Sequence, residues 1–389
     1  MRYAIITETY PPEINGVALT VQSLEHGLRA RGHTVDLVRP TQLDETTAAA
    51  ESITPADGLS VVRGIPLPRY PNLRVGLPCA KRLEALWTAR RPDALYVATE
   101  GPLGNSAVAV ANRLGIPVIT GFHTRFDHYV ADYGFPFLRK TAVAWMRRFH
   151  NRANMTLVPT LALKRELESL GFANAQCLRR AVDCARFNPA KRNASLRTSW
   201  GLGREDLAVL FIGRIAAEKN LELAIDAFRA LQRHRPDARF IWIGDGPLRA
   251  EVEEAHNDFI FTGMLRGDEL AEAIASTDLF PFSSLSETFG NVTLEAMASG
   301  VPVVAFDYGA AHEFLRRNIH GDVIPLHDEN AFIAAATKLA LNDRTRREMG
   351  LACRRAMEAL QPEQVAADLD TLFQQLIERG SAHANVALA

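Results

Sequence analysis

The chain has 389 residues, 47% of them hydrophobic and 23% charged, and its formal net charge is −1 at pH 7. This length is too great for one ordinary hydrophobic core and suits two domains, while the near-neutral charge gives no bulk reason for binding nucleic acid. The four cysteines form no C-x-x-C pair, so the sequence predicts neither a disulfide framework nor a metal site. There is no signal-peptide pattern and no apolar run near the ~18–20 residues of a membrane span, so a cytoplasmic protein is expected.

Short apolar segments alternate with amphipathic helical segments along the whole chain. In the first half we expect strands at 3–8, 33–38, 94–99 and 116–122 and helices at 17–32 and 104–115. After residue 200 the alternation starts again, with strands expected at 207–213, 239–246, 259–263, 279–283 and 301–306 and helices at 220–234, 247–256 and 268–277. Nearly continuous apolar strands that alternate with helices indicate parallel sheets covered on both faces.

Two such series predict an α/β protein with two doubly wound, Rossmann-like domains. The periodicity lapses around Pro189 and Asn193, where a connection between the domains is expected. Ligands of open parallel sheets bind beyond the carboxyl ends of the strands, and we expect the two domains to face each other across a cleft. The predicted parts are an N-terminal domain at 1–185, a linker at 186–198, a C-terminal domain at 199–362 and a C-terminal helix at 363–380 that packs back on the N-terminal domain.

In the first domain, candidate ligand-binding residues follow the expected strands. Gly16 opens the first helix, where a glycine lets a phosphate or sugar approach the backbone. His123 follows the strand at 116–122, with Asp127 and His128 a few residues further on. A histidine in this place can bind a sugar hydroxyl or transfer a proton; the alternative is a histidine satisfied by backbone carbonyls.

In the second domain, the segment "GRIAAEKN" places Gly213, Arg214 and Lys219 between a strand and a helix. A planar guanidinium and a lysine beside a glycine suit a diphosphate. The alternative is a solvated pair of cations that Glu218 partly neutralises. The turn "IGDGP" lacks the third glycine of a dinucleotide-binding fingerprint, and the chain has no P-loop motif, so an NAD site and a P-loop NTPase are disfavoured.

The segment "SETFGNVTLEAMASG", residues 286–300, places Glu287 just before a helix and Glu295 inside it. Free N–H groups and partial positive charge at the start of a helix suit a phosphate. Carboxylates on either side can accept hydrogen bonds from hydroxyl groups. Taken with the cations upstream, these residues predict a site for a nucleotide diphosphate that carries a sugar.

These segments together resemble glycosyltransferase family 4, which consists of retaining transferases with two Rossmann-like domains, the GT-B fold. The resemblance covers nearly the whole chain, from "ITETYPPEINGV" to the last helix, and "RYPNLRVGLP" and "FHTRFDHYVADYG" are similar to the bacterial branch of mannosyl- and glycolipid-forming enzymes. It implies that the N-terminal domain binds the acceptor and the C-terminal domain binds the nucleotide sugar. Two departures concern hinge geometry or donor selection: Ala181 replaces the glycine of the usual "GVD", and "YGAAHE" at 308–313 replaces a "GG" followed by Pro-Glu.

The resemblance also implies a role for each candidate residue. Glu287 would hold hydroxyls of the donor sugar, and Glu295 would hold the ribose, so the two glutamates are not an acid/base pair. The remaining implied roles are phosphate contacts by the backbone of Phe289, Gly290 and Asn291, neutralisation of the leaving diphosphate by Arg214 and Lys219, approach to the diphosphate by Gly16, and contact with the transferred sugar by His123. With cations on the phosphates, neither a metal nor a cofactor is expected.

The implied function is transfer of a hexose, with retention, from a nucleotide diphosphate sugar to a hydroxyl of a lipid-linked or glycan acceptor. GDP-mannose is the first choice of donor and a UDP-hexose the second. The alternatives are a nucleotide-sugar epimerase of the same fold and a catalytically silent protein that binds sugar nucleotides or glycans. No residue pattern selects the base, the sugar, the acceptor or the oligomeric state.

A basic segment raises the question of membrane contact. Between Tyr133 and Arg165 there is no acidic residue. A basic amphipathic helix can rest on anionic lipid, which would place the protein on the inner face of the membrane; the alternative is a core stripe of Leu138, Ala142, Trp145 and Phe149 with a solvated basic side. The basic residues of the segment include Arg139, Lys140, Arg147, Arg148, Arg152 and Lys164.

Overall fold

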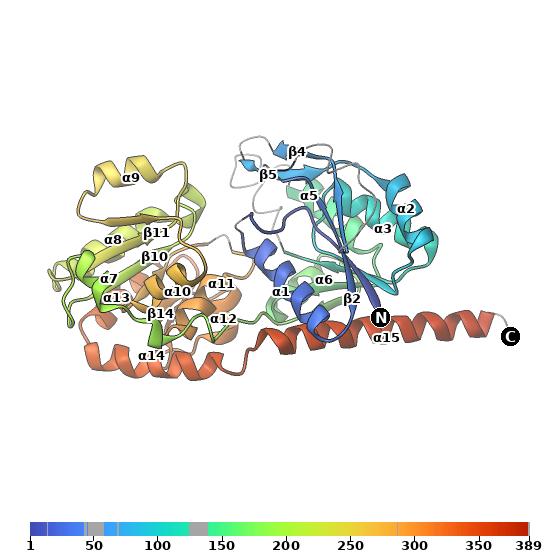
Figure 1. Cartoon of the computed structure of the whole chain (residues 1–389). Helices are drawn as coiled ribbons and strands as arrows, with labels where there is room; N and C mark the ends of the chain where they lie inside the picture. Colours follow the sequence, from blue (N-terminus) through green and yellow to red (C-terminus); the bar gives the residue numbers. More distant parts are fainter. Residues whose placement is uncertain are drawn as a thin grey trace. The chain divides into compact units, whose positions relative to one another are not determined.

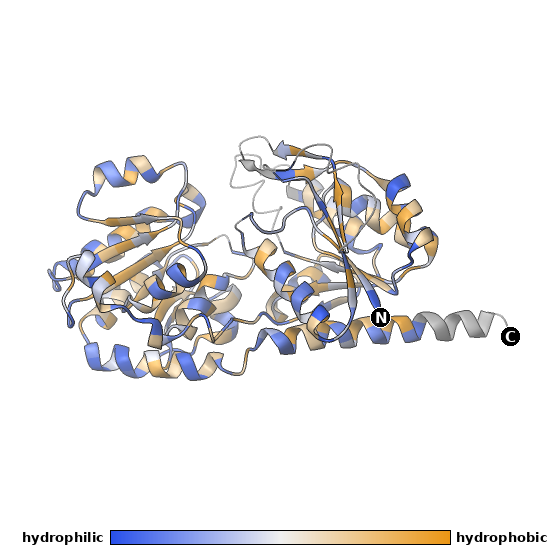
Figure 2. Cartoon of the chain, in the orientation of Figure 1, coloured by the Kyte–Doolittle hydropathy of each residue, from blue (hydrophilic) through white to orange (hydrophobic). Residues whose placement is uncertain are grey.

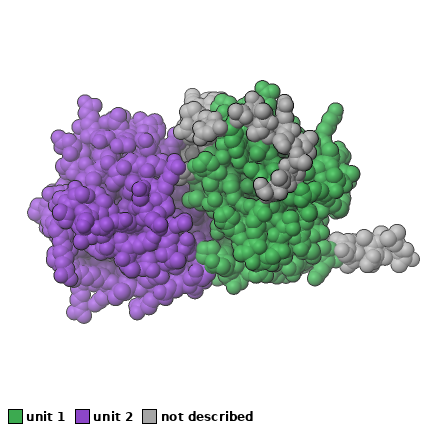
Figure 3. All heavy atoms as spheres, in the orientation of Figure 1, with its two compact units in different colours: residues 1–179, 362–389 green, residues 180–361 purple. Residues whose placement is uncertain are grey.

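The computed structural model describes residues 1–13, 15–42, 45, 58–67, 70–123, 139–285 and 287–387. They form two compact units (Figure 3): unit 1 comprises residues 1–179 and 362–389, and unit 2 comprises residues 180–361. No described helix is both long and apolar enough to cross a membrane.

The segment 186–198 is part of unit 2 and not a separate linker. It contains the short helix η3 (Pro189–Lys191) and the start of α7 (Ala194–Ser199). Arg192 and Arg197 both donate to the carboxylate of Asp278, at 2.7 and 3.0 Å. Because this carboxylate also accepts from a backbone N–H of the sheet, at Ala208, the segment is tied to the core of unit 2.

Unit 1 is built on a seven-stranded parallel sheet with the order β3-β2-β1-β6-β7-β8-β9. Chain order reverses between β1 and β6, which makes their carboxyl ends the topological switch point. A further antiparallel pair, β4 (Gly64–Leu67) with β5 (Tyr70–Gly76), was not predicted. The strands of the main sheet are β1 (Arg2–Ile6), β2 (Thr34–Pro40), β3 (Leu59–Val62), β6 (Ala94–Val97), β7 (Val118–Gly121), β8 (Met155–Val158) and β9 (Ala175–Cys177).

Helices cover both faces of this sheet, and alternate residues of β1 belong to different cores. Tyr3 and Ile5 pack in a cluster with residues of α1 and α15, whereas Ala4 and Ile6 pack in a cluster with residues of α2 and α3. This is the period of two that a strand imposes, and Figure 2 shows hydrophobic strands inside the unit. The helices are α1 (Gly16–Ala30), α2 (Ala80–Ala89), α3 (Pro102–Leu114), α5 (Arg139–His150), α6 (Leu161–Ser169) and α15 (Pro362–Ala387).

The C-terminal helix α15 completes the core of unit 1, in agreement with the prediction that it packs back on this domain (Figure 1). Leu369 and Phe373 are fully buried, and the Phe373 ring stacks on Tyr3 with 4.4 Å between the ring centroids. Asp370, on the same helix, accepts hydrogen bonds from the hydroxyl of Tyr3 at 2.7 Å and from Arg31 at 3.1 Å. Apolar burial and a buried carboxylate therefore both hold α15 in place.

Unit 2 contains two three-stranded parallel ladders, which a parallel bridge between Val209 and Leu279 joins. The combined order is β12-β11-β10-β13-β14-β15, so chain order reverses between β10 and β13. This is the strand order of the dinucleotide-binding Rossmann fold, whose ligands bind at that reversal. The strands are β10 (Ala208–Ile212), β11 (Arg239–Ile243), β12 (Ile260–Gly263), β13 (Phe280–Phe282), β14 (Val303–Phe306) and β15 (Gly321–Ile324).

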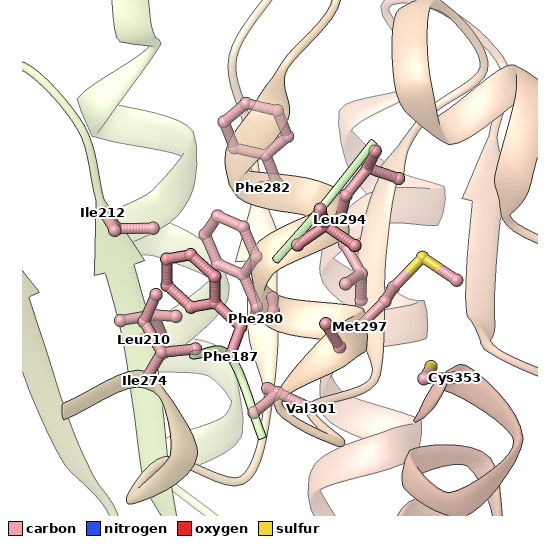
Figure 4. Packing of buried hydrophobic residues seen from close by; sticks show 14 of the residues in the cluster. Phe187, Leu210, Ile212, Ile274, Phe280, Phe282, Leu294, Met297, Val301 and Cys353 are labelled. Atoms are coloured by element: carbon pink, nitrogen blue, oxygen red, sulfur yellow. The ribbon is translucent and has the colours of Figure 1, made fainter. Parts of the chain in front are cut away.

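One face of this sheet supports the helix α11. Leu210 and Phe280, on neighbouring strands, pack in one cluster with Leu294 and Met297 of α11 (Figure 4). The opposite face packs on α8 and α13. The helices of the unit, besides α7, are α8 (Leu221–Gln232), α9 (Arg249–Ala255), α10 (Gly267–Ala275), α11 (Asn291–Ala298), α12 (Gly309–Phe314), α13 (Glu329–Ala340) and α14 (Asp343–Met357), with the short helix η4 at Ala217–Lys219.

Candidate functional site

In unit 2, an ion pair forms at the topological switch point. Lys219 ends η4, which follows β10, and Glu287 follows β13, so the two neighbouring strands bring together residues 68 positions apart. The Nζ atom of Lys219 contacts Oε1 of Glu287, and each side chain is 19% exposed. The hydroxyl of Ser284 donates to the same oxygen at 3.0 Å. A ligand at this edge of the sheet can therefore reach both a cation and a carboxylate.

Arg214 is the second cation of the predicted site, and it lies directly after β10. Its Nη1 atom is 3.1 Å from the carboxylate of Glu218, whose side chain is 10% exposed. One alternative from the sequence was that Glu218 partly neutralises the two cations. Glu218 does pair with Arg214, whereas Lys219 pairs with Glu287. Gly213 lies between β10 and Arg214, and its N–H donates to the carbonyl of Ile243 on β11 at 3.1 Å.

The helix α11 begins at this edge with Asn291, and Gly290 is its N-cap residue with φ +90°. As a glycine, this residue has no side chain that could cap the helix, and backbone N–H groups at the start of a helix can bind an anion. Phe289 is 5% exposed, and its carbonyl accepts a hydrogen bond from the N–H of Ala310 at 2.7 Å. The residues predicted to contact phosphates therefore lie at the start of a helix.

Glu295 lies inside α11 in a different environment from Glu287. It is half-buried, and this burial raises the pKa of its carboxyl group to about 7, although the positive charge of Arg186 lowers it. The protonation state of Glu295 consequently changes close to neutral pH, and only the ionised form is a pure acceptor for hydroxyl groups.

In unit 1, His123 follows β7 and is buried, with 9% of its surface exposed. Its Nε2 atom is 2.7 Å from the hydroxyl of Tyr96, which lies on the neighbouring strand β6. A Cβ atom on Gly121 would lie 2.3 Å from that hydroxyl and 2.5 Å from Nε2, so the pair needs a glycine here. One partner of this histidine is therefore a side-chain hydroxyl. Asp127 and His128 lie outside the described residues.

Gly16 is the first residue of α1, as predicted, but the start of this helix is already capped. Oδ1 of Asn15 accepts hydrogen bonds from the N–H groups of Val17 and Ala18, at 3.1 and 2.8 Å. Two of the donors that a phosphate would use are therefore occupied. Asn15 stands in the N-cap position, where asparagine is preferred, so the residue before Gly16 carried a signal that the sequence analysis did not use.

Glu8 is a buried carboxylate at the switch point of unit 1 that the sequence analysis did not identify. Its two oxygens accept from the N–H of Leu103, at the start of α3, at 3.0 Å and from the N–H of Gly76, the last residue of β5. Burial raises the pKa of Glu8 to about 7, against the effect of these hydrogen bonds. Its position at the end of an apolar strand gave no sign that it caps a helix 95 residues away.

Comparison with known proteins places these observations in a family. The model of Glycosyltransferase Family 4 matches residues 14–186, and the model of glycosyl transferases group 1 matches residues 206–342. The GDP-mannose-dependent alpha-mannosyltransferase of Mycobacterium tuberculosis is 32% identical over 360 residues, which are 92% of each chain. The chain belongs to glycosyltransferase family 4. The family prediction is confirmed, and nothing among these matches supports the epimerase alternative.

Two further likenesses bear on this family 4 glycosyltransferase. The alpha-monoglucosyldiacylglycerol synthase of Streptococcus pneumoniae is 26% identical over 320 residues, covering 78% of this chain and 71% of that one. Among solved structures, the sucrose-phosphate synthase of Thermosynechococcus elongatus has a TM-score of 0.78 at 18% identity, over 97% of this chain and 99% of that one. The predicted fold class, two Rossmann-like domains of the GT-B type, is confirmed.

Proposed function

We propose that the protein is a retaining hexosyltransferase that moves mannose from GDP-mannose to a hydroxyl of a lipid-linked or glycan acceptor. The observation that carries this proposal is the Lys219–Glu287 pair at the switch point of unit 2, beside the start of α11, whose N-cap residue is a glycine. The similarity to the GDP-mannose-dependent alpha-mannosyltransferase of Mycobacterium tuberculosis supports GDP-mannose as the donor, with a UDP-hexose as the second choice.

In this proposal the donor separates Lys219 from Glu287. Without a donor the two charges neutralise each other, whereas a bound diphosphate competes for Lys219 and sugar hydroxyls compete for Glu287. A sugar that occupies the carboxylate therefore helps to release the cation to the phosphates. Glu295 would hold the ribose, and His123 in unit 1 would contact the transferred sugar.

The chemical step requires stabilisation of separated charge. The sugar acquires oxocarbenium character while a diphosphate departs, and Lys219, Arg214 and the N–H groups of α11 would stabilise the departing group. The leaving phosphate would accept the proton of the acceptor hydroxyl on the same face of the sugar, so no carboxylate nucleophile is required. That neither a metal nor a cofactor takes part remains a prediction.

A thermal-shift titration with GDP, UDP, ADP, GDP-mannose and UDP-glucose tests the donor. At pH 8, where Glu295 is ionised, GDP and GDP-mannose should stabilise the protein, by about 2.7 kcal/mol at a hundred times the dissociation constant. At pH 6, below the pKa of about 7, the carboxyl group is mostly protonated and the shift should be smaller. A shift with UDP compounds alone would identify a UDP-hexose donor, and the absence of any shift would contradict the proposed function.

We also propose that the exposed face of α5 contacts an anionic membrane surface. Met146 and Phe149 are buried, but Trp145, predicted in one alternative to be in the core, is 44% exposed. Lys140 and Arg148 are exposed on the same helix. Arg147, also on α5, donates to the carbonyl of Leu170 at 3.1 Å. The side chain of Arg139 lies outside the described part of the chain.

Sedimentation with phospholipid vesicles measures this contact. The wild type should sediment with vesicles rich in anionic lipid and not with neutral vesicles, because each basic residue near such a surface contributes about 1 kcal/mol. The double variant Trp145→Ala, Arg148→Glu should lose this binding. Arg344→Glu is the matched control, since Arg344 is an exposed arginine on α14 of unit 2. Equal binding by the wild type and the double variant would contradict the proposal.

A further inference from the structure

The hydroxyl of Tyr308 joins two backbone groups of the candidate site. It donates to the carbonyl of Ser284 at 2.6 Å and accepts from the N–H of Glu287 at 3.3 Å. These two groups, three residues apart, are the pair that a β-turn would join directly. Burial raises the pKa of the Tyr308 phenol, so the hydroxyl keeps the proton that it donates.

The backbone at Ser284 and Glu287 is connected to both charged groups of the site. The Ser284 hydroxyl donates to the Glu287 carboxylate, as described above. The hydroxyl of the preceding Ser283 donates to the carbonyls of Lys219 and Asn220, at 3.2 and 3.0 Å. A change in the separation of Ser284 and Glu287 would therefore move the carboxylate relative to the lysine.

The segment that carries Tyr308 is itself fixed against the phosphate-binding residues. The N–H of Ala310 bonds to the carbonyl of Phe289, and a Cβ on Gly309 would lie 2.6 Å from that same oxygen. Gly309 also has φ +57°, a conformation that favours glycine. Ala310, one of the departures from the family pattern, is fully buried. The segment that follows β14 is thus fixed against Phe289.

We propose that Tyr308 is a positioning residue that holds the carboxylate of Glu287 where it meets Lys219 and the donor sugar, by placing its hydroxyl between the carbonyl of Ser284 and the N–H of Glu287. This inference rests on the proposed function, in which Glu287 binds the sugar. Without the hydroxyl, the two backbone groups either bond directly or stay unpaired, and both outcomes displace Glu287.

Calorimetric titration of full-length Tyr308→Phe with GDP and with GDP-mannose tests the proposal. Binding of GDP-mannose should weaken by about tenfold, the effect of losing a hydrogen bond to a charged group, while binding of GDP changes less than twofold. Tyr3→Phe is the matched control, because the hydroxyl of Tyr3 also makes a 2.7 Å bond, to Asp370 in unit 1. The control should lower the melting temperature and leave both affinities unchanged.

A double-mutant cycle with Glu287→Gln shows whether Tyr308 acts through Glu287. In the Glu287→Gln background, Tyr308→Phe should add less than twofold, because the displaced carboxylate is already absent. If the affinities for GDP and GDP-mannose fall equally, or if the losses of affinity add in the double variant, the positioning role of Tyr308 is wrong. The proposed function would not be affected by that outcome. If Glu287→Gln itself leaves GDP-mannose binding unchanged, the proposed sugar contact is wrong and the inference falls with it.

Discussion

Replacing Lys219 by alanine is expected to lower turnover by about 10²–10³-fold, the usual effect of losing one preorganised charge that stabilises a developing anion. Lys219 would meet the leaving diphosphate, whose negative charge grows as the glycosidic bond breaks. The variant also leaves Glu287, only 19% exposed, without the cation that it contacts, and its uncompensated charge would repel the phosphates. Both effects act in the same direction.

The measurement is release of GDP from GDP-mannose in the presence of a bacterial lipid extract, alongside circular dichroism to show that the fold is intact. Lys191→Ala provides the control, because it removes another lysine–carboxylate pair of unit 2, with Asp268, on elements that the proposed mechanism does not use. Turnover should fall in the first variant and stay near the wild-type value in the control. Full activity of Lys219→Ala would remove the main support for the site.

Replacing Phe373 by alanine is expected to lower the free energy of unfolding of unit 1 by about 3–5 kcal/mol, as for other fully buried phenylalanines. The ring is completely buried and stacks on Tyr3 of β1, so the substitution removes apolar contacts from both the helix and the sheet. Such a loss is a large part of the ~5–15 kcal/mol that stabilises a typical domain.

Urea unfolding followed separately in the two units measures this effect. Gln374→Ala changes the next residue of the same helix, which is exposed, and it should leave unfolding within about 0.5 kcal/mol of the wild type. Unit 2 contains no part of α15, so its transition should not move in either variant. An unchanged transition of unit 1 in Phe373→Ala would show that α15 does not contribute to the core.

The main strands and helices could be predicted because the parallel sheets are buried on both faces. The apolar runs at 207–213 and 301–306, for instance, contain β10 and β14. The pair of β4 and β5 escaped prediction, since both strands contain proline and glycine in place of an apolar run. The segment 186–198 looked like a linker because its contacts are made by arginines with distant carbonyls and carboxylates.

The sequence was enough to predict which residues belong to the candidate site, but not which of them contact each other. Lys219 and Glu287 stand after strands, and a ligand site there follows from the fold class. Their pairing depends on β10 and β13 being neighbours, which no local pattern reveals. The hydrogen bonds of the Tyr96 and Tyr308 hydroxyls were missed for the same reason. A tyrosine in or just after an apolar strand is predicted to be a core residue, and the partner of its hydroxyl is known only once the strand order is known.

Because α15 belongs to the first unit but follows the second in the chain, unit 1 can complete its core only after unit 2 has been synthesised. Unit 2 is one continuous segment of roughly 180 residues, and it can complete its core as soon as it leaves the ribosome. The sheet of unit 1 must wait while unit 2 is translated, about 10–40 s at bacterial and eukaryotic rates of synthesis. During that interval the side chains that will meet Leu369 and Phe373 are uncovered, and a chaperone that binds apolar surface has its best substrate in the nascent N-terminal half.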